Sequence, residues 1–233
     1  MADTLNVSTY KDISYQLKKS DRKTTSIYIE RDGTVLVIAP SPFDVEKIEQ
    51  IIESKRSWIY KSLADWEDLN RTRIHREYVN GESFLYFGRN YRLQLVKDQL
   101  EPLTFHYGQF KLLDSEVANA PDHFKNFYKT KLQQRLDERL KLYQPKMKLK
   151  PASIRVMELQ KRWGSCTSKG VINLHWKCAM LPLSVLDYVI VHELAHLEDK
   201  NHSPKFWRTI EKVMPDYGEA KKWLKFNGAG MSL

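Results

Sequence analysis

Two histidines and a glutamate stand in the pattern His-Glu-x-x-His, at His192, Glu193 and His196. Residues four positions apart lie on the same face of an α-helix, so this spacing would place the two imidazoles side by side. Two neutral imidazoles in that arrangement can bind one Zn²⁺. The carboxylate of Glu193 would project beside them, where it could take a proton from water. The pattern therefore predicts metal-assisted hydrolysis.

The residues before this pattern are almost entirely apolar. The run from Val185 to Val191 contains a single charged side chain, Asp187, and a helix that is apolar nearly all round is a buried one. Polar groups in a core are costly unless they are paired. Either the two histidines are core residues bonded to carbonyl groups, or they bind a metal. We favour the metal, because the pattern would arise by chance in about one such chain in a hundred.

A third ligand would have to come from beyond this helix. A straight helix would carry His202 about 15 Å along the axis from His192 and off the shared face. The helix must therefore end before His202, and the polar residues 198–201 permit such an end. Ser203 and Pro204 are residue types typical of an N-cap and a first helical position.

The sequence offers two kinds of third ligand. His202 would complete a three-histidine site, whereas Glu211 or Glu219 would give two histidines and one carboxylate. We favour His202, because imidazole suits zinc and the expected helix end would fold this residue back toward the metal. One zinc ion per chain is then expected, with its fourth position open to water. The new helix would bury four apolar residues, Phe206, Trp207, Ile210 and Val213.

These residues carry a resemblance to a known family. The run His192-Glu193-x-x-His196-x5-His202, followed by Phe206-Trp207 and Pro215-Asp216-Tyr217, resembles the YgjP-like metallopeptidases, which are zincin relatives of the SprT-like proteases. The stretches 162–166 and 170–174 match as well, and the N-terminal half matches less sharply. The resemblance implies a zincin catalytic domain with one catalytic zinc and metal-dependent hydrolase or peptidase activity, and it implies no defined substrate. We expect a protein or peptide as the substrate. His175 stands where the family more often has asparagine.

Five further residues are candidates for roles around the site. Tyr217 could stabilise the oxyanion, or it could be a packed aromatic residue. Asp187 could orient a ligand imidazole through a hydrogen bond, or it could complement the helix dipole. In a zincin, a strand before the metal helix borders the cleft, so Arg162, Trp163 and Ser165 could bind substrate. Alternatively, Trp163 packs in the core and Arg162 caps a carbonyl group.

Length and composition bound the class of protein. With 233 residues, 42% of them hydrophobic, the chain can form one large domain or two small ones. No stretch approaches the roughly 18 apolar residues that span a bilayer, and residues 1–11 lack a signal-peptide pattern. Cys166 and Cys178 form no paired metal motif and no disulfide framework, so we read them as small buried residues. A cytoplasmic setting is expected.

The hydrophobic pattern predicts an α+β fold. We expect a β-rich N-terminal region with one helix over residues 1–117, and a zincin-like domain with an active-site helix over residues 118–233. The expected N-terminal elements are a hairpin of 26–29 and 35–38 around Asp32-Gly33, a helix over 44–69, and short strands at 84–87, 91–95 and 103–105. After a boundary at 118–121 we expect a charged helix over 123–143, and a hairpin of 157–159 with 171–174 around the turn 167–170.

The charge balance suggests an alternative function. The formal net charge is +9, which favours polyanionic partners such as nucleic acid. Basic residues gather around one predicted helix: Lys125, Lys129, Lys131, Arg135, Arg139, Lys141, Lys146, Lys148 and Lys150. A smaller group is Lys18, Lys19, Arg22 and Lys23. The chain could thus be a DNA-linked protease or a basic binding module, although such a helix is usually a solvated face. A zinc-bearing interaction domain without turnover is a third interpretation, and the intact Glu193 argues against it.

Overall fold

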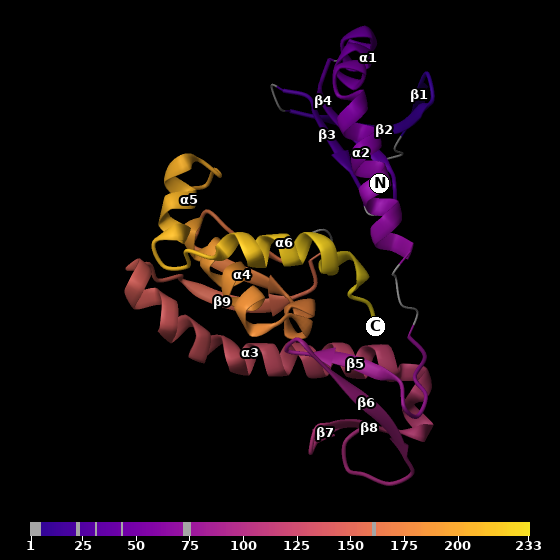
Figure 1. Cartoon of the computed structure of the whole chain (residues 1–233), viewed down its shortest axis with the longest axis vertical. Coiled ribbons are helices and arrows are strands. Elements are labelled where there is room, and N and C mark those ends of the chain that lie inside the picture. The colour runs from indigo at the N-terminus through magenta and orange to yellow at the C-terminus, as the bar shows by residue number, and fades with distance from the viewer. Residues whose placement is uncertain (1–5, 22–23, 31, 43, 72–75, 160–161) are drawn as a thin grey trace. The chain divides into compact units, whose positions relative to one another are not determined.

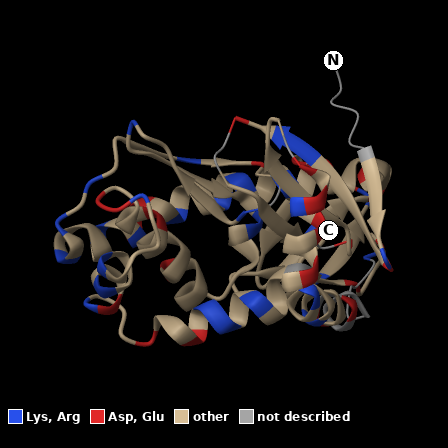
Figure 2. Ribbon diagram, turned by 90° about the horizontal axis from the view of Figure 1, so that it is seen from above, with Lys and Arg blue, Asp and Glu red and all other residues tan. Residues whose placement is uncertain are grey.

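The computed structural model describes residues 6–21, 24–30, 32–42, 44–71, 76–159 and 162–233. The chain forms two compact units, Met1–Arg73 and Ile74–Leu233, which are described separately (Figure 1). Both units mix strands and helices, so the fold is α+β, as predicted. Lysine and arginine outnumber acidic residues, 38 to 29, and both kinds are spread over helices and strands rather than confined to one element (Figure 2). No helix in the described ranges is long and apolar enough to cross a membrane.

The N-terminal unit is a four-stranded sheet with two helices. The strands are β1 (Asn6–Tyr10), β2 (Ile13–Ser20), β3 (Ser26–Ile29) and β4 (Val35–Pro40), in the order β1-β2-β4-β3, with only β2 and β4 parallel. The predicted hairpin of β3 and β4 is confirmed, and its turn places Gly33 at a φ of 84°, a conformation that favours glycine. The core of this unit consists of Ile13, Tyr15, Val35, Val37, Ala39, Ile48, Ile52 and Ile59.

The predicted helix over 44–69 is two helices. Helix α1 (Val45–Ser54) begins with Asp44, whose carboxylate accepts a hydrogen bond from the backbone N–H of Glu46 at 3.0 Å. Helix α2 (Arg56–Arg71) follows after Lys55. The prediction of a single helix was wrong at Lys55. The helical spacing of the apolar residues continues from α1 into α2, so the hydrophobic pattern does not reveal the break.

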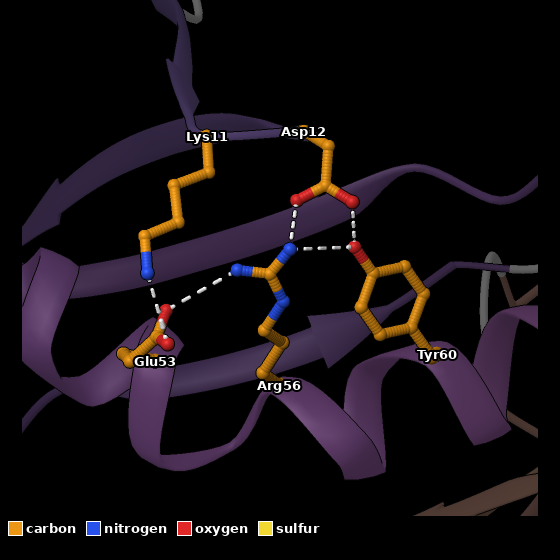
Figure 3. A network of polar contacts seen from close by, with 5 residues as sticks. All are labelled: Lys11, Asp12, Glu53, Arg56 and Tyr60. Atoms are coloured by element: carbon orange, nitrogen blue, oxygen red, sulfur yellow. Dashed lines mark hydrogen bonds and ion pairs between the residues drawn. The ribbon is translucent and has the colours of Figure 1, made fainter.

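A network of polar side chains ties the turn between β1 and β2 to both helices (Figure 3). Lys11 forms an ion pair of 3.0 Å with Glu53, and Arg56 contacts Glu53 at 3.4 Å. Arg56 and the hydroxyl of Tyr60 both donate to Asp12. These groups are largely exposed, so each contact alone contributes little to the stability of the fold. Arg56 links the contacts to one another, because it binds both Glu53 and Asp12.

The C-terminal unit contains a second four-stranded sheet and a long helix. The sheet consists of β5 (Ser83–Tyr86), β6 (Arg89–Val96), β7 (Leu103–His106) and β8 (Gln109–Leu113), in the order β5-β6-β8-β7. A short 3-10 helix, Asp114–Asn119, leads into α3 (Ala120–Met147). Along α3 a residue is buried at every fourth position: Ala120, Phe124, Tyr128, Leu132, Leu136 and Leu140. The stripe makes α3 amphipathic, and the charged helix predicted over 123–143 is confirmed within these bounds.

Aromatic packing joins this sheet to α3. The rings of Phe84 and Phe124 stack with 4.2 Å between centroids, and Phe110 lies 5.1 Å from Phe124. The hydroxyl of Tyr128 donates to the carbonyl of Leu85 at 2.6 Å. The division between the two compact units therefore falls between residues 73 and 74, whereas the sequence suggested a boundary at 118–121. Residues 118–121 are the end of the 3-10 helix and the start of α3, and the residues before and after them share one core.

The remaining elements surround the metal helix predicted from the sequence. A three-stranded sheet has the order β10-β11-β9, from β9 (Ser153–Met157), β10 (Gly164–Cys166) and β11 (Val171–His175). A 3-10 helix, η2 (Trp176–Met180), then leads into α4 (Leu183–Ala195), α5 (Pro204–Glu211), α6 (Tyr217–Asn227) and the short helix η3 (Gly228–Gly230) (Figure 1).

The hairpin expected between 157–159 and 171–174 was wrong in its first strand. Strand β11 pairs antiparallel with β10, around the predicted turn 167–170, and parallel with β9. The turn is tight, because the N–H of Thr167 donates to the carbonyl of Val171 at 2.9 Å. The strand that pairs with β11 across this turn therefore consists of the residues directly before the turn. Strand β10 thus lies at the edge of the sheet.

Candidate metal centre

Helix α4 carries His192 in its last turn and has His196 as its C-cap, and both histidines are half-buried. Its residues from Val185 to Val191 are all buried, as predicted. The helix begins after Pro182, whose carbonyl accepts a hydrogen bond from the N–H of Val185 at 3.0 Å, and it ends one residue before His196. The rings of His192 and His196 lie one turn apart, with 4.9 Å between their centroids.

The loop after α4 turns the chain back toward these rings. The carboxylate of Asp199 accepts hydrogen bonds from the N–H of Asn201, at 2.8 Å, and from the hydroxyl of Ser203. Ser203 also caps α5, since its oxygen accepts the N–H of Phe206 at 3.3 Å. The predicted helix end is therefore present, and the next helix begins at the predicted proline.

Three imidazoles converge at this loop. The Nε2 atoms of His192 and His202 are 3.1 Å apart, and the possible ligand atoms of His192, His196 and His202 all lie within 4.8 Å of one another. Nitrogens bound tetrahedrally to one zinc ion at its usual bond length would be roughly 3.3 Å apart. Small movements of the rings would therefore bring all three nitrogens onto one ion, so the donor set and its spacing fit zinc.

Hydrogen bonding and burial keep these rings ready to bind a cation. Nδ1 of His196 donates to the carbonyl of Asp199 at 2.9 Å, which leaves Nε2 with its lone pair free. Burial, followed by the neighbouring His196 and His202, lowers the pKa of His192 to about 3. Partial burial and His196 also lower the pKa of His202. His192 is therefore neutral at pH 7, which is the form that binds metal.

Glu193 lies next to the first ligand and is 5% exposed. Its Oε2 atom is buried and has no hydrogen-bond partner in the described part of the chain. Burial raises the pKa of Glu193 to about 7, and the positive charge of Arg162 opposes this rise. An unpaired buried carboxyl group beside three imidazoles is costly for folding alone, which makes it a candidate for function.

Gly164 leaves the space that Glu193 occupies. A Cβ atom on this residue would lie 2.6 Å from both Cγ and Oε1 of Glu193, a distance that side chains do not tolerate. Gly164 belongs to the edge strand β10, so the glutamate packs directly against the backbone of that strand. Sequence reasoning gave this glycine no role of its own.

A column of four rings leads away from the third histidine. His202 stacks on Trp207, Trp207 on Tyr217, and Tyr217 on Tyr188, with interplanar angles of 29°, 17° and 14°. Tyr217 is thus held between two aromatic rings, one ring removed from His202. Tyr217 is therefore a packed aromatic residue. Its role in stabilising the oxyanion stays a prediction.

Asp187 is not positioned to orient a ligand imidazole. Its carboxylate accepts a hydrogen bond of 2.7 Å from Nε of Arg139, a second from the same guanidinium, and one of 2.9 Å from the hydroxyl of Tyr143. All of these partners lie on α3. The carboxylate therefore fastens the metal helix to α3, an interaction that neither proposed role anticipated.

The three candidate substrate residues lie on or just before β10. Arg162 is exposed and acts on Glu193 through its charge. Trp163 is half-buried, packs on the main core and closely approaches Gly228. Ser165 accepts a hydrogen bond from Asn173 at 3.3 Å across the hairpin. His175, on the next strand, caps η2 by accepting the N–H of Lys177 at 3.0 Å.

The other possible ligands lie apart from the histidine cluster. Within the described residues, the only group of possible metal ligands is the three histidines, and it includes neither cysteine and neither Glu211 nor Glu219. Cys178 is fully buried and Cys166 half-buried, both as free thiols. Burial raises the pKa of both thiols. The interpretation of the cysteines as packing residues fits this placement.

Comparison with known proteins places the chain in a family. The model of the "YgjP-like, metallopeptidase domain" matches residues 23–227. The crystal structure of the metallopeptidase zymogen of Pyrococcus abyssi abylysin is similar at 26% identity, over 38% of this chain and 90% of that one, with a TM-score of 0.36. No curated protein matches the chain. Because the family model spans most of the sequence, the chain belongs to the YgjP-like metallopeptidase domain family.

Proposed function

We propose that this protein is a zinc-dependent metallopeptidase that hydrolyses peptide bonds. The observation that carries the proposal is the convergence of three imidazoles beside one buried, unpaired carboxyl group. This arrangement has no evident structural purpose and contains the groups that metal-assisted hydrolysis requires. Membership of a metallopeptidase family supports the same reading.

His192, His196 and His202 would hold the metal. Zinc bound there would polarise the scissile carbonyl and make water acidic enough to react near neutral pH. The carbonyl of Asp199 fixes the ring of His196 in the tautomer that leaves Nε2 unprotonated. Trp207 holds the ring of His202, which lies outside α4, by stacking on its face. With three protein ligands, the ion would remain open to water.

Glu193 would act as the general base. Its carboxylate would take a proton from the attacking water and later deliver that proton to the leaving amine. The surrounding core excludes competing hydrogen-bond partners, so the carboxylate is free to accept this proton. Burial raises the pKa of Glu193 to about 7, a value at which the group can both take up and release a proton near neutral pH.

The edge strand β10 would align the substrate. One of its edges pairs with β11, and its position at the end of the sheet order leaves the other edge for an extended peptide. Arg162 and Ser165 would lie along such a peptide, and Trp163 would support the strand from the core side. The hydroxyl of Tyr217 is the proposed donor to the developing oxyanion.

Metal content and substrate trapping test this proposal together. Purified protein should contain about one zinc per chain, and His196→Ala should lose it. Glu193→Gln should retain the metal and capture uncleaved substrate proteins, which proteomic analysis would identify. His123→Ala is the matched control, since His123 pairs with Glu116 outside the cluster. Full zinc retention in a His192→Ala/His196→Ala double variant would contradict the site.

A basic pocket favours nucleic acid as a second partner. A pocket of about 510 Å³ between the end of α3 and α5 is lined by Lys146, Lys148, Lys205, Arg208 and Lys212, against one acidic residue, Glu198, which pairs with Lys205. Five cations in one pocket suit a phosphate backbone. Elsewhere on α3 the charge is partly neutralised, because Lys125, Arg135 and Arg139 form ion pairs. Arg22 and Lys23 of the smaller basic group lie outside the described residues.

A mobility-shift titration discriminates this second function. Binding of single-stranded and duplex DNA should weaken steeply with salt, and Lys148→Gln/Arg208→Gln should reduce both the affinity and the salt slope. Lys125→Gln, whose ammonium is already paired with Glu158, is the matched control. Absence of binding at low salt would reject the nucleic-acid function and leave the peptidase proposal unaffected. Zinc retention without cleavage of any peptide would instead favour a non-catalytic interaction domain.

A further inference from the structure

A lysine on α6 lies one aromatic ring away from two of the three histidines. The Nζ atom of Lys221 is 4.2 Å from the centroid of the Trp207 ring, within the range of a cation–π contact. The Trp207 ring is in turn 5.8 Å from the ring of His202 and 6.0 Å from that of His192. The indole therefore holds the ammonium group at the border of the metal centre.

Lys221 is an exposed residue of α6, so its ammonium group is open to a ligand from solvent. No carboxylate of the described residues forms an ion pair with Lys221. The carboxylate of Asp199, in the loop before His202, already accepts hydrogen bonds from Asn201 and Ser203.

This arrangement of positive charges favours the binding of an anionic ligand. An ammonium group close to a site that collects a dication adds repulsion, which a negative group between the two charges would relieve. Arg162, whose charge acts on Glu193, adds a second positive charge. The indole face restricts the lysine without neutralising it, so a bound anion would not have to order a freely moving side chain.

We propose that Lys221, supported by Trp207, is a subsite that binds a carboxylate group of the substrate beside the metal. This inference rests on the proposed peptidase function. The chemistry that it selects is a carboxylate, supplied either by the C-terminus of a peptide or by an acidic side chain. Lys221 contacts the substrate in this scheme and takes no part in proton transfer.

Three synthetic peptides test the subsite by calorimetric titration. One is acetyl-dialanine with a free C-terminal carboxylate, the second is its C-terminal amide, and the third is an amide peptide that carries glutamate in place of one alanine. The titrations use the full chain loaded with zinc and, separately, the metal-free chain. At least one carboxylate peptide should bind about three- to fivefold more tightly than the neutral amide, as expected for a partly exposed ion pair.

Substitution of the lysine assigns that preference. Lys221→Gln should abolish the discrimination between charged and neutral peptides, and Lys221→Arg should retain it. Lys222→Gln is the matched control, since Lys222 is the neighbouring exposed lysine on the same helix. Preference for the free C-terminus or for the glutamate peptide identifies the source of the carboxylate. Equal affinity for all three peptides, or unchanged discrimination in Lys221→Gln, overturns the subsite, whereas failure to take up zinc contradicts only the proposed function.

Discussion

A Cβ atom on Gly164 would come within 2.6 Å of Cγ and Oε1 of Glu193. The edge strand of the small sheet and the proposed general base therefore fit together only because this position lacks a side chain. The glycine has no positive φ, so the requirement is one of space rather than backbone conformation.

Gly164→Ala should consequently displace the carboxyl group and leave the metal in place. A shift of about 1 Å in a catalytic group can cost roughly 100-fold in rate, so kcat on a validated peptide substrate should fall by about that factor. Zinc content, measured by atomic emission, should stay near that of the unaltered protein. Gly218→Ala is the control, because a Cβ there would meet nothing within 4 Å. Equal loss of activity in both variants would contradict the proposed contact.

The metal-free protein should become more stable at neutral pH when Glu193 is replaced by glutamine. The pKa of Glu193 is 4.5 in a model compound and about 7 in the folded chain. Between these values the unfolded carboxyl group ionises while the folded one keeps its proton, so folding stability falls as pH rises. The loss is complete above pH 7 and amounts to about 3 kcal/mol at most.

Chemical unfolding in the presence of a chelator measures this effect. Glu193→Gln should raise the free energy of unfolding at pH 8 and change it little at pH 4. The lowered pKa of His192 destabilises the folded protein as pH falls below the pKa of histidine in the unfolded chain. This effect is the same in the unaltered protein and in Glu193→Gln, so it cancels when their free energies of unfolding are subtracted. Zinc should shrink the difference, since a nearby dication favours the ionised carboxylate. An equal gain at both pH values would show that the pKa of Glu193 is not its cause.

Much of the metal centre follows from local sequence. The four-residue spacing of His192 and His196 fixes their shared face, and the polar residues before Ser203-Pro204 mark the turn that brings in His202. Such inferences succeed because a helix has a fixed period and because capping residues act within a few positions.

Relationships across the sequence were not accessible in this way. The partner of Asp187 is Arg139, 48 residues away, and no spacing rule connects an aspartate on one helix to an arginine on another. The parallel pairing of β9 with β11 and the contact of Gly164 with Glu193 are equally non-local. The chain divides after residue 73, because aromatic side chains of β5 and β8 pack on α3, which composition alone does not reveal.

Removal of the metal should lower the stability of the C-terminal unit. A ligand that binds only the folded state stabilises it by about 4 kcal/mol when its free concentration is 1,000 times its Kd. Zinc should therefore raise Tm in a concentration-dependent manner, and a chelator should reverse the rise. His202→Ala should weaken this response, because its imidazole is one of three, while His123→Ala should preserve it. A Tm that is independent of zinc in the unaltered protein would contradict the metal centre.

Arg139→Ala should destabilise the protein without altering its affinity for zinc. Asp187 is 4% exposed, and removal of Arg139 leaves its carboxylate with only the hydroxyl of Tyr143. Breaking a buried ion pair in this way costs about 3 kcal/mol or more, measurable by urea unfolding. Arg135→Ala, which breaks an exposed pair with Glu138, should cost less than about 1 kcal/mol.

If Asp187 oriented a ligand imidazole instead, the Asp187→Asn variant would bind zinc more weakly by about tenfold or more. Unchanged zinc affinity in Asp187→Asn, together with reduced stability, would establish that this carboxylate holds α4 on α3.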